Sequence, residues 1–117
     1  MDNQVSVLIA DNSEEFCASL ANQLERSNHW RVVATVQNGE DAIAAIKEKQ
    51  PQILVLDLML MKQDGLSVLK AIAPMEKKPL VLATSGFITD YVASAAAALG
   101  VRYLMPKPCD MTALCEH

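Results

Sequence analysis

The sequence predicts an α/β domain with a parallel sheet, because five short apolar segments alternate with longer amphipathic ones. The apolar segments are rich in Val, Ile and Leu, and they are Val5–Ala10, Arg31–Val36, Ile53–Asp57, Pro79–Thr84 and Val101–Met105. Nearly continuous apolar runs of this length are typical of strands that are buried on both faces. The alternation predicts parallel strands joined by right-handed crossovers, with helices on both faces of the sheet.

The segments between the strands have the period of amphipathic helices. Their apolar residues recur three or four positions apart: Phe16, Leu20 and Leu24, then Ala42, Ile43 and Ile46, then Leu66, Leu69 and Ile72, then Val92, Ala96 and Leu99. Asn12 and Asn38 are candidate N-caps, each with an acid three residues later. Gly100 stands where the residue after a helix end is expected, and a short fifth helix is expected to begin at Asp110.

Length and charge limit the class of protein. The chain has 117 residues, which suits one domain spanning 1–117, and it is 51 % hydrophobic but only 4 % aromatic, so its core is aliphatic. Ten basic and 14 acidic residues give a net charge of −4, which argues against binding to nucleic-acid phosphates by this domain. The three cysteines form no CxxC pair, no signal peptide is evident and no apolar run is long enough to span a bilayer. These features predict a soluble cytoplasmic domain without a zinc site.

Polar side chains follow four of the predicted strands. Asp11 and Asn12 follow the first, Asp57 ends the third, Thr84 and Ser85 end the fourth, and Lys107 follows the fifth. In open parallel sheets, ligands bind at the carboxyl ends of the strands, where the strand order reverses. Each residue alone has an ordinary explanation as a turn, a cap or a surface charge. Packing does not require all of these polar residues at the same edge of the sheet, so we expect them to form a functional site.

The residue types at this edge indicate phosphoryl-transfer chemistry. Two close carboxylates repel each other unless a cation lies between them, and hard oxygen ligands favour Mg²⁺. A carboxylate beside Mg²⁺ and an ammonium group is a plausible nucleophile, because these cations neutralise the transferred group. Asp57 is the strongest candidate, since it ends the most apolar strand of the chain.

These motifs resemble those of a known family. The sequence is similar, over essentially its whole length, to the receiver domains of two-component response regulators, on Val7–Asp11, Leu54–Asp57, Asp64-Gly65, Thr84 and Lys107-Pro108. A narrower similarity, to the amino-terminal receiver of sporulation master transcription regulators, rests on Ala10–Asn12, Asn38-Gly39, Lys47–Lys49 and Lys107–Met111.

The resemblance implies a flavodoxin-like fold, with five parallel strands in the order 2-1-3-4-5, and a set of roles. Asp57 would accept a phosphoryl group from a histidine kinase or phosphorelay protein. Asp11, Asn12, Asp57 and the Met59 carbonyl would hold Mg²⁺, and Thr84 and Lys107 would contact the phosphoryl oxygens. The Lys107–Pro108 peptide would be cis, against the usual preference of X–Pro bonds. The domain would catalyse at most its own phosphorylation and dephosphorylation.

Several positions depart from the family pattern. Asn12 replaces the usual second acid, so we expect weak Mg²⁺ binding; Leu60 and Met61 stand where Met-Pro is usual, and Pro106 removes a strand donor. Leu104 replaces the usual aromatic switch residue. We therefore expect switching through Thr84, Ser85 and the loop that runs to Asp90, with Tyr103 in the aromatic role.

The resemblance also implies a larger protein. The truncated last helix and the acidic charge favour the input half of a transcription regulator with a DNA-binding domain beyond this chain. A homodimer would form through the fourth helix, fifth strand and fifth helix. One alternative is a pseudo-receiver, an interaction module that is not phosphorylated, which Asn12 and Leu104 favour. A second, an enzyme on a flavodoxin-like fold, is disfavoured because the sequence has no glycine-rich phosphate loop and no histidine base.

Overall fold

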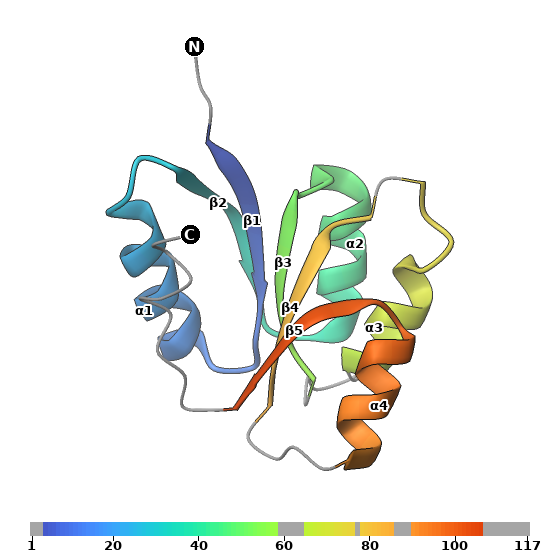
Figure 1. The fold of residues 1–117 in the computed structure, drawn as a ribbon. Coiled ribbons are helices and arrows are strands. Elements are labelled where there is room, and N and C mark those ends of the chain that lie inside the picture. The colour runs from blue at the N-terminus through green and yellow to red at the C-terminus, as the bar shows by residue number, and fades with distance from the viewer. Residues whose placement is uncertain (1–3, 59–64, 77, 86–89, 107–117) are drawn as a thin grey trace.

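Five parallel strands form one sheet in the order β2-β1-β3-β4-β5 in a computed structural model of the chain (Figure 1). The strands are β1 (Val5–Ala10), β2 (Trp30–Val36), β3 (Ile53–Asp57), β4 (Leu80–Ser85) and β5 (Val101–Pro106). The structure describes residues 4–58, 65–76, 78–85 and 90–106. The predicted fold class and strand order are confirmed.

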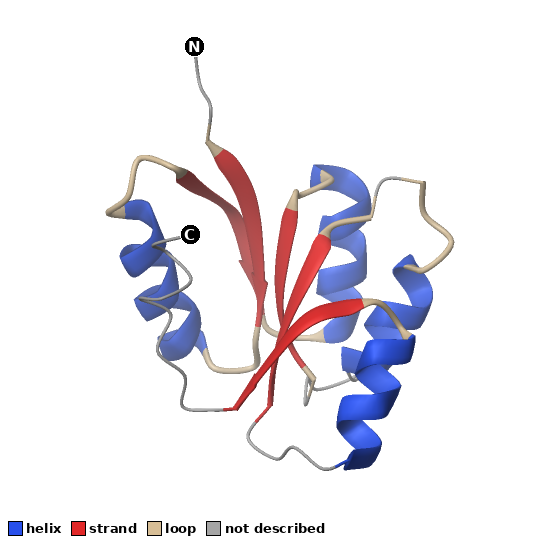
Figure 2. Ribbon diagram, in the orientation of Figure 1, coloured by secondary structure: helices blue, strands red, loops and turns tan. Residues whose placement is uncertain are grey.

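Helices lie on both faces of the sheet, as the alternation predicts (Figure 2). They are α1 (Glu14–Glu25), α2 (Gly39–Lys49), α3 (Gly65–Ile72) and α4 (Asp90–Ala98). Figure 1 shows α1 on one side of the sheet and α2, α3 and α4 on the other. No helix of the described residues has the length and apolar character to cross a membrane.

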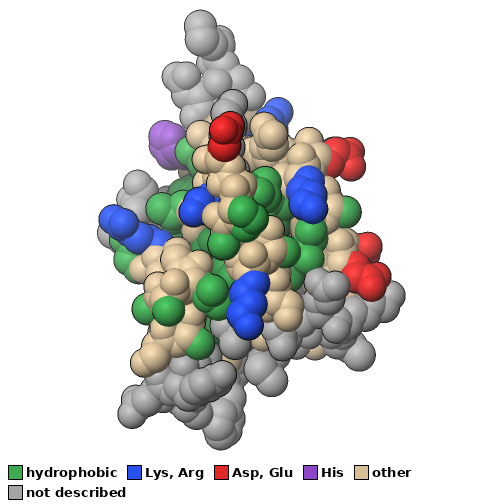
Figure 3. Space-filling view, turned by 90° about the vertical axis from the view of Figure 1, so that its right-hand side faces the viewer, with side chains coloured by type: hydrophobic (Ala, Val, Ile, Leu, Met, Phe, Trp, Pro, Cys, Tyr) green, Lys and Arg blue, Asp and Glu red, His purple; other side chains and the backbone are tan. Residues whose placement is uncertain are grey.

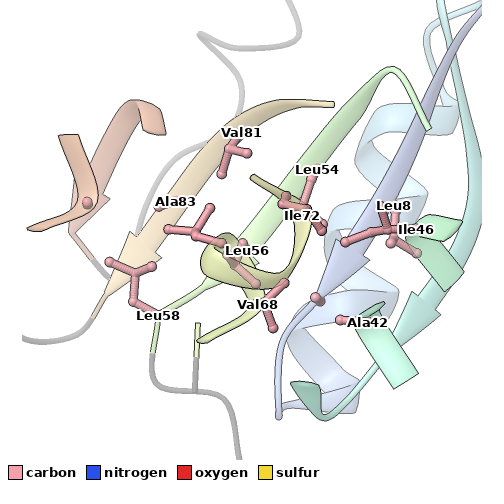
Figure 4. Close-up of a cluster of buried hydrophobic side chains, with 13 residues drawn as sticks. Leu8, Ala42, Ile46, Leu54, Leu56, Leu58, Val68, Ile72, Val81 and Ala83 are labelled. Atoms are coloured by element: carbon pink, nitrogen blue, oxygen red, sulfur yellow. The ribbon is translucent and has the colours of Figure 1, made fainter. Parts of the chain in front are cut away.

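Two aliphatic clusters hold these layers together. The larger cluster lies between the sheet and α2, α3 and α4, and Figure 4 shows strand residues such as Leu8 and Leu56 with Ile46 and Val68 from the helices. The smaller cluster lies on the α1 side and contains Val7, Ile9, Cys17, Leu20, Leu24, Trp30, Val55 and Leu82. Alternate strand residues belong to different clusters, because successive side chains of a strand point to opposite faces.

Three strands differ from the sequence-based expectation, by one residue at each of four boundaries. β2 begins at Trp30, whose side chain is buried against the α1-side cluster, and not at Arg31. β4 runs from Leu80 to Ser85, because Pro79 has no N–H while the Leu80 N–H donates to the Gln52 carbonyl at 2.9 Å. β5 continues to Pro106, which is tolerated because β5 is an edge strand.

The helix caps correct one prediction and confirm another. Ser13, not Asn12, is the N-cap of α1, because its Oγ accepts a hydrogen bond from the Phe16 N–H at 3.1 Å. Asn38 caps α2 as predicted, and its Oδ1 accepts from the Asp41 N–H at 2.8 Å. Gly100, between α4 and β5, has φ of +94°, a conformation that favours glycine.

Candidate functional site

The buried polar side chains gather at one edge of the sheet. Within the described residues, the buried polar or charged side chains are Asp11, Asp57, Thr84 and Ser85, with exposed fractions of 1 %, 3 %, 0 % and 0 %. All four lie at the carboxyl ends of the neighbouring strands β1, β3 and β4. Buried carboxylates are costly to desolvate, and a fold that places two of them together at one edge indicates a functional site.

Strand register brings these side chains next to one another. Ala10 of β1 pairs with Leu56 of β3, so Asp11 and Asp57 follow a pair of register partners. Asp57 itself pairs with Thr84 of β4, and the Leu58 N–H donates to the Thr84 carbonyl at 2.9 Å. The two carboxylates and the hydroxyl predicted for the site therefore lie on three adjacent strand ends.

Asp11 is fixed by contacts on several sides. Its N–H donates to the Val36 carbonyl at 3.0 Å, and its Oδ1 accepts from the Ser13 N–H at 2.9 Å. The Cys17 thiol donates to the Asp11 carbonyl at 3.6 Å. Cys17 is a buried free thiol, and its contact with the Asp11 carbonyl has no signal in the sequence. These contacts orient the Asp11 carboxylate before any ligand binds.

Thr84 brings a buried hydroxyl to the site. Its Oγ1 has no hydrogen-bond partner within the part of the chain that the structure describes. An unsatisfied buried hydroxyl costs about 1–3 kcal/mol, so folds avoid it unless a partner arrives later. The adjacent carboxylate of Asp57 is the place at which an added group with acceptor oxygens would meet this hydroxyl.

Asn12 differs from its neighbour in burial. Its side chain is exposed, whereas Asp11 is buried. Among the described residues, no group of three His, Cys, Asp or Glu side chains could hold a metal ion. Mg²⁺ is commonly bound by one or two carboxylates with several waters retained, so the oxygens of Asp11 and Asp57 suit this ion. The donor set fits Mg²⁺ but provides less charge than three acids.

Two of the candidate switch residues, Leu104 and Tyr103, lie on opposite faces of β5. Leu104 packs against the cluster formed with α2, α3 and α4, whereas Tyr103 pairs with Leu82, which belongs to the α1-side cluster. The Tyr103 side chain is 56 % exposed. Ser85 is fully buried at the end of β4.

Other predicted features lie outside the described residues. They are Lys107, the Met59 carbonyl, Leu60, Met61, the Lys107–Pro108 peptide bond, the loop residues 86–89 and the fifth helix from Asp110.

The fold and this edge agree with a comparison of the sequence with known families. The family described as Response regulator receiver domain matches residues 7–117. Because the match spans nearly the whole sequence, the chain belongs to this family of receiver domains.

Solved structures show the same fold at low sequence identity. The receiver domain of the putative response regulator NarL from Mycobacterium tuberculosis has a TM-score of 0.90 at 24 % identity, covering 97 % of this chain and 92 % of that one. A DNA-binding response regulator of the LuxR family from Staphylococcus aureus has a TM-score of 0.88 at 22 % identity, covering 96 % and 93 %. A response regulator from Burkholderia pseudomallei, solved with a phosphorylated aspartic acid, calcium and citrate, has a TM-score of 0.85 at 22 % identity, covering 95 % and 64 %.

Proposed function

We propose that the domain is a phosphoacceptor whose Asp57 receives a phosphoryl group from a phosphohistidine on a histidine kinase or phosphotransfer protein. The observation that carries this proposal is the clustering of Asp11, Asp57 and Thr84, all buried, at adjacent strand ends. Membership of the receiver family supports it, since receiver domains interact with such donors.

The chemistry follows from the positions of these side chains. An Asp57 carboxylate oxygen forms a bond to phosphorus while the bond from phosphorus to the histidine nitrogen breaks, and that nitrogen leaves with the electron pair. The product is an acyl phosphate with roughly 1.5 to 2 negative charges at the sheet edge. Thr84 is the register partner of Asp57 across β3 and β4, so its hydroxyl is placed to donate a hydrogen bond to the new oxygens.

Mg²⁺ and Lys107 supply the positive charge in this proposal. Asp11 and Asp57, with the Asn12 amide oxygen and the Met59 carbonyl, are the residues that would hold the ion. Bound Mg²⁺ neutralises charge on the transferred group. We propose that this binding is weak, because the exposed Asn12 contributes no charge where a second acid would.

We extend the proposal to the whole protein. The phosphorylated domain would switch an attached DNA-binding domain, as in a cytoplasmic transcription regulator, and would dimerise through α4, β5 and the helix that follows. The motifs Ala10–Asn12 and Lys107–Met111 favour the sporulation master transcription regulators as the branch of the receiver family to which this domain would belong. The LuxR-family protein from Staphylococcus aureus, described as DNA-binding, supports the attachment of such a domain.

Incubation with Mg²⁺ and acetyl phosphate, followed by intact-mass measurement, tests the proposed acceptor. We expect the wild-type protein to gain the mass of one phosphoryl group, and Asp57→Asn to gain none. Glu14→Gln is the matched control, because Glu14 is an exposed acid in the first turn of α1. An Asp57→Asn protein that still gained a phosphate cleaved by hydroxylamine, as acyl phosphates are, would contradict the assignment of Asp57.

A pseudo-receiver remains the second candidate function, and Asn12 is the observation that favours it. In that case the same incubation would leave the wild-type mass unchanged even at high Mg²⁺ concentration. A partner would then recognise the unmodified domain.

A further inference from the structure

The face on which each β5 side chain lies decides which of them can respond to Thr84. Thr84 pairs with Met105, and Leu82 pairs with Tyr103. Since alternate residues of a strand share a face and register partners point the same way, all four side chains lie on the α1 side of the sheet. The packing agrees, because Met105 contacts the cluster that contains Leu82 and Val55.

Leu104 lies on the opposite side of the sheet. It pairs with Ala83 and packs against the cluster formed with α2, α3 and α4. The sheet therefore separates the Leu104 side chain from that of Thr84. Any signal from the Thr84 side chain reaches Met105 directly and Leu104 only through the backbone.

The buried hydroxyl of Thr84 supplies the driving force for a rearrangement. It lacks a hydrogen-bond partner among the described residues, and a phosphoryl group on its register partner Asp57 carries strong acceptor oxygens. A Thr side chain turns between staggered positions, and each turn moves both its hydroxyl and its methyl group to new positions. Thr84 of β4 lies between its two register partners, Asp57 of β3 and Met105 of β5. A turn of the Thr84 side chain therefore changes the shape of the surface that faces Met105.

Met105 is suited to such a response, and its strand leads to the surface. Its half-buried side chain is unbranched and flexible, so it repacks at low cost. The preceding residue on the same face of β5 is Tyr103, 56 % exposed. Leu80, on the same face of β4, is 41 % exposed. Along the same face of β4 and β5, Thr84 and Met105 are thus followed by exposed hydrophobic side chains.

We propose that Met105 senses the position of the Thr84 side chain and passes the change to Tyr103 on the α1 side of β5. Met105 thereby replaces the coupling that the usual aromatic residue at position 104 would provide. This proposal rests on the proposed function, because a phosphoryl group on Asp57 starts the change.

Two adjacent residues of β5 provide matched variants. Met105 and Leu104 are both half-buried, and their side chains lie on opposite faces. The protein is labelled with fluorotyrosine, which reports on Tyr91 and Tyr103, and the Tyr103 signal is assigned with Tyr103→Phe. Beryllium fluoride with Mg²⁺ is the phosphoryl mimic, and its fluorine signal shows directly whether the adduct has formed.

We expect the adduct to shift the Tyr103 signal in the wild type and in Leu104→Ala, and to leave it unshifted in Met105→Ala. A shift that survives in Met105→Ala, or one that is lost only in Leu104→Ala, would overturn the proposal. Absence of the adduct signal in the wild type would overturn the proposed function instead, and the coupling with it.

A second measurement needs no variant that could fail to fold. Labelled methionine methyl groups in the wild type compare Met105 with Met75, which is also half-buried but packs against the cluster on the opposite face. We expect the adduct to shift the Met105 methyl signal and to leave that of Met75 unchanged. An adduct that forms without a response at Met105 would overturn the proposal.

Discussion

Asn12 shows how one side chain sets the metal affinity that we propose for this site. It neighbours the buried carboxylate of Asp11, yet its own side chain is exposed and neutral. An amide oxygen can coordinate Mg²⁺, but it does not offset the cost of dehydrating the ion as a carboxylate does. The same neutrality lowers the repulsion among acids when no metal is bound.

Replacement of Asn12 by Asp should therefore tighten Mg²⁺ binding. We expect about a tenfold gain in affinity, which corresponds to about 1.4 kcal/mol, and faster phosphorylation at limiting Mg²⁺. Titration followed by NMR of the backbone amides measures the affinity without any phosphodonor. Asn28→Asp controls for the added charge, because Asn28 is an exposed loop residue. Equal or weaker binding in Asn12→Asp would show that Asn12 does not lie at the metal.

Helix α2 follows the usual capping preference at its N-terminus and departs from the usual backbone preference at its C-terminus. Asn38 caps its first turn with two contacts, an Oδ1 that accepts from the Asp41 N–H at 2.8 Å and an Nδ2 that donates to Asp41 Oδ2 at 3.0 Å. Its last turn ends at Gln50, whose φ of +46° is left-handed. The first feature stabilises the helix, and the second costs backbone energy in a residue other than glycine.

Loss of the cap should destabilise the fold. We expect Asn38→Ala to lower the free energy of unfolding by about 1 kcal/mol, because an Asp41 N–H loses its acceptor. Urea unfolding measures this difference. The matched variant Asn28→Ala, in an exposed loop, should change stability far less. Equal effects of the two variants would contradict the role of the cap.

Relief of the left-handed residue should stabilise the fold. We expect Gln50→Gly to raise the unfolding free energy by roughly 0.5–1 kcal/mol, since the gain in backbone conformation exceeds the added entropy of the unfolded chain. The exposed neighbour Lys49, inside α2, gives the opposite control, because Lys49→Gly should destabilise the helix by about 1 kcal/mol. A loss of stability in Gln50→Gly would contradict this account.

At the scale of the molecule, the sequence was sufficient to predict the fold and the sheet edge at which the buried polar residues of the candidate site gather. Each strand has its own apolar run, and four of the five runs lead into the candidate polar residues, Asp57 and Thr84 among them. The cap of α1 was predicted at Asn12 and lies at Ser13, because two polar residues in succession offer equivalent candidates to a local pattern. The contact of the Cys17 thiol with the Asp11 carbonyl depends on how α1 packs against the end of β1, and the pairing of Thr84 with Met105 depends on register. A local pattern encodes neither.

The charge distribution predicts how the domain behaves toward DNA. On the face in Figure 3, Lys and Arg side chains lie apart from one another, among hydrophobic and acidic ones, and the chain carries a net charge of −4. Nucleic-acid binding depends on clustered positive charge that displaces counterions. We expect the 117-residue chain to show no salt-dependent binding to duplex DNA in a mobility-shift assay at low salt. Binding that weakens steeply with added salt would contradict this prediction.

Chemical trapping of the phosphoryl group tests the central claim most directly. After incubation with Mg²⁺ and acetyl phosphate, borohydride reduces an aspartyl phosphate to homoserine, and peptide mass mapping then locates the changed residue. We predict homoserine at position 57 and at no other acid, with none formed when the phosphodonor is left out. Homoserine at Asp11 or elsewhere, or its absence at position 57 at saturating Mg²⁺, would contradict the assignment of Asp57 as the phosphoacceptor.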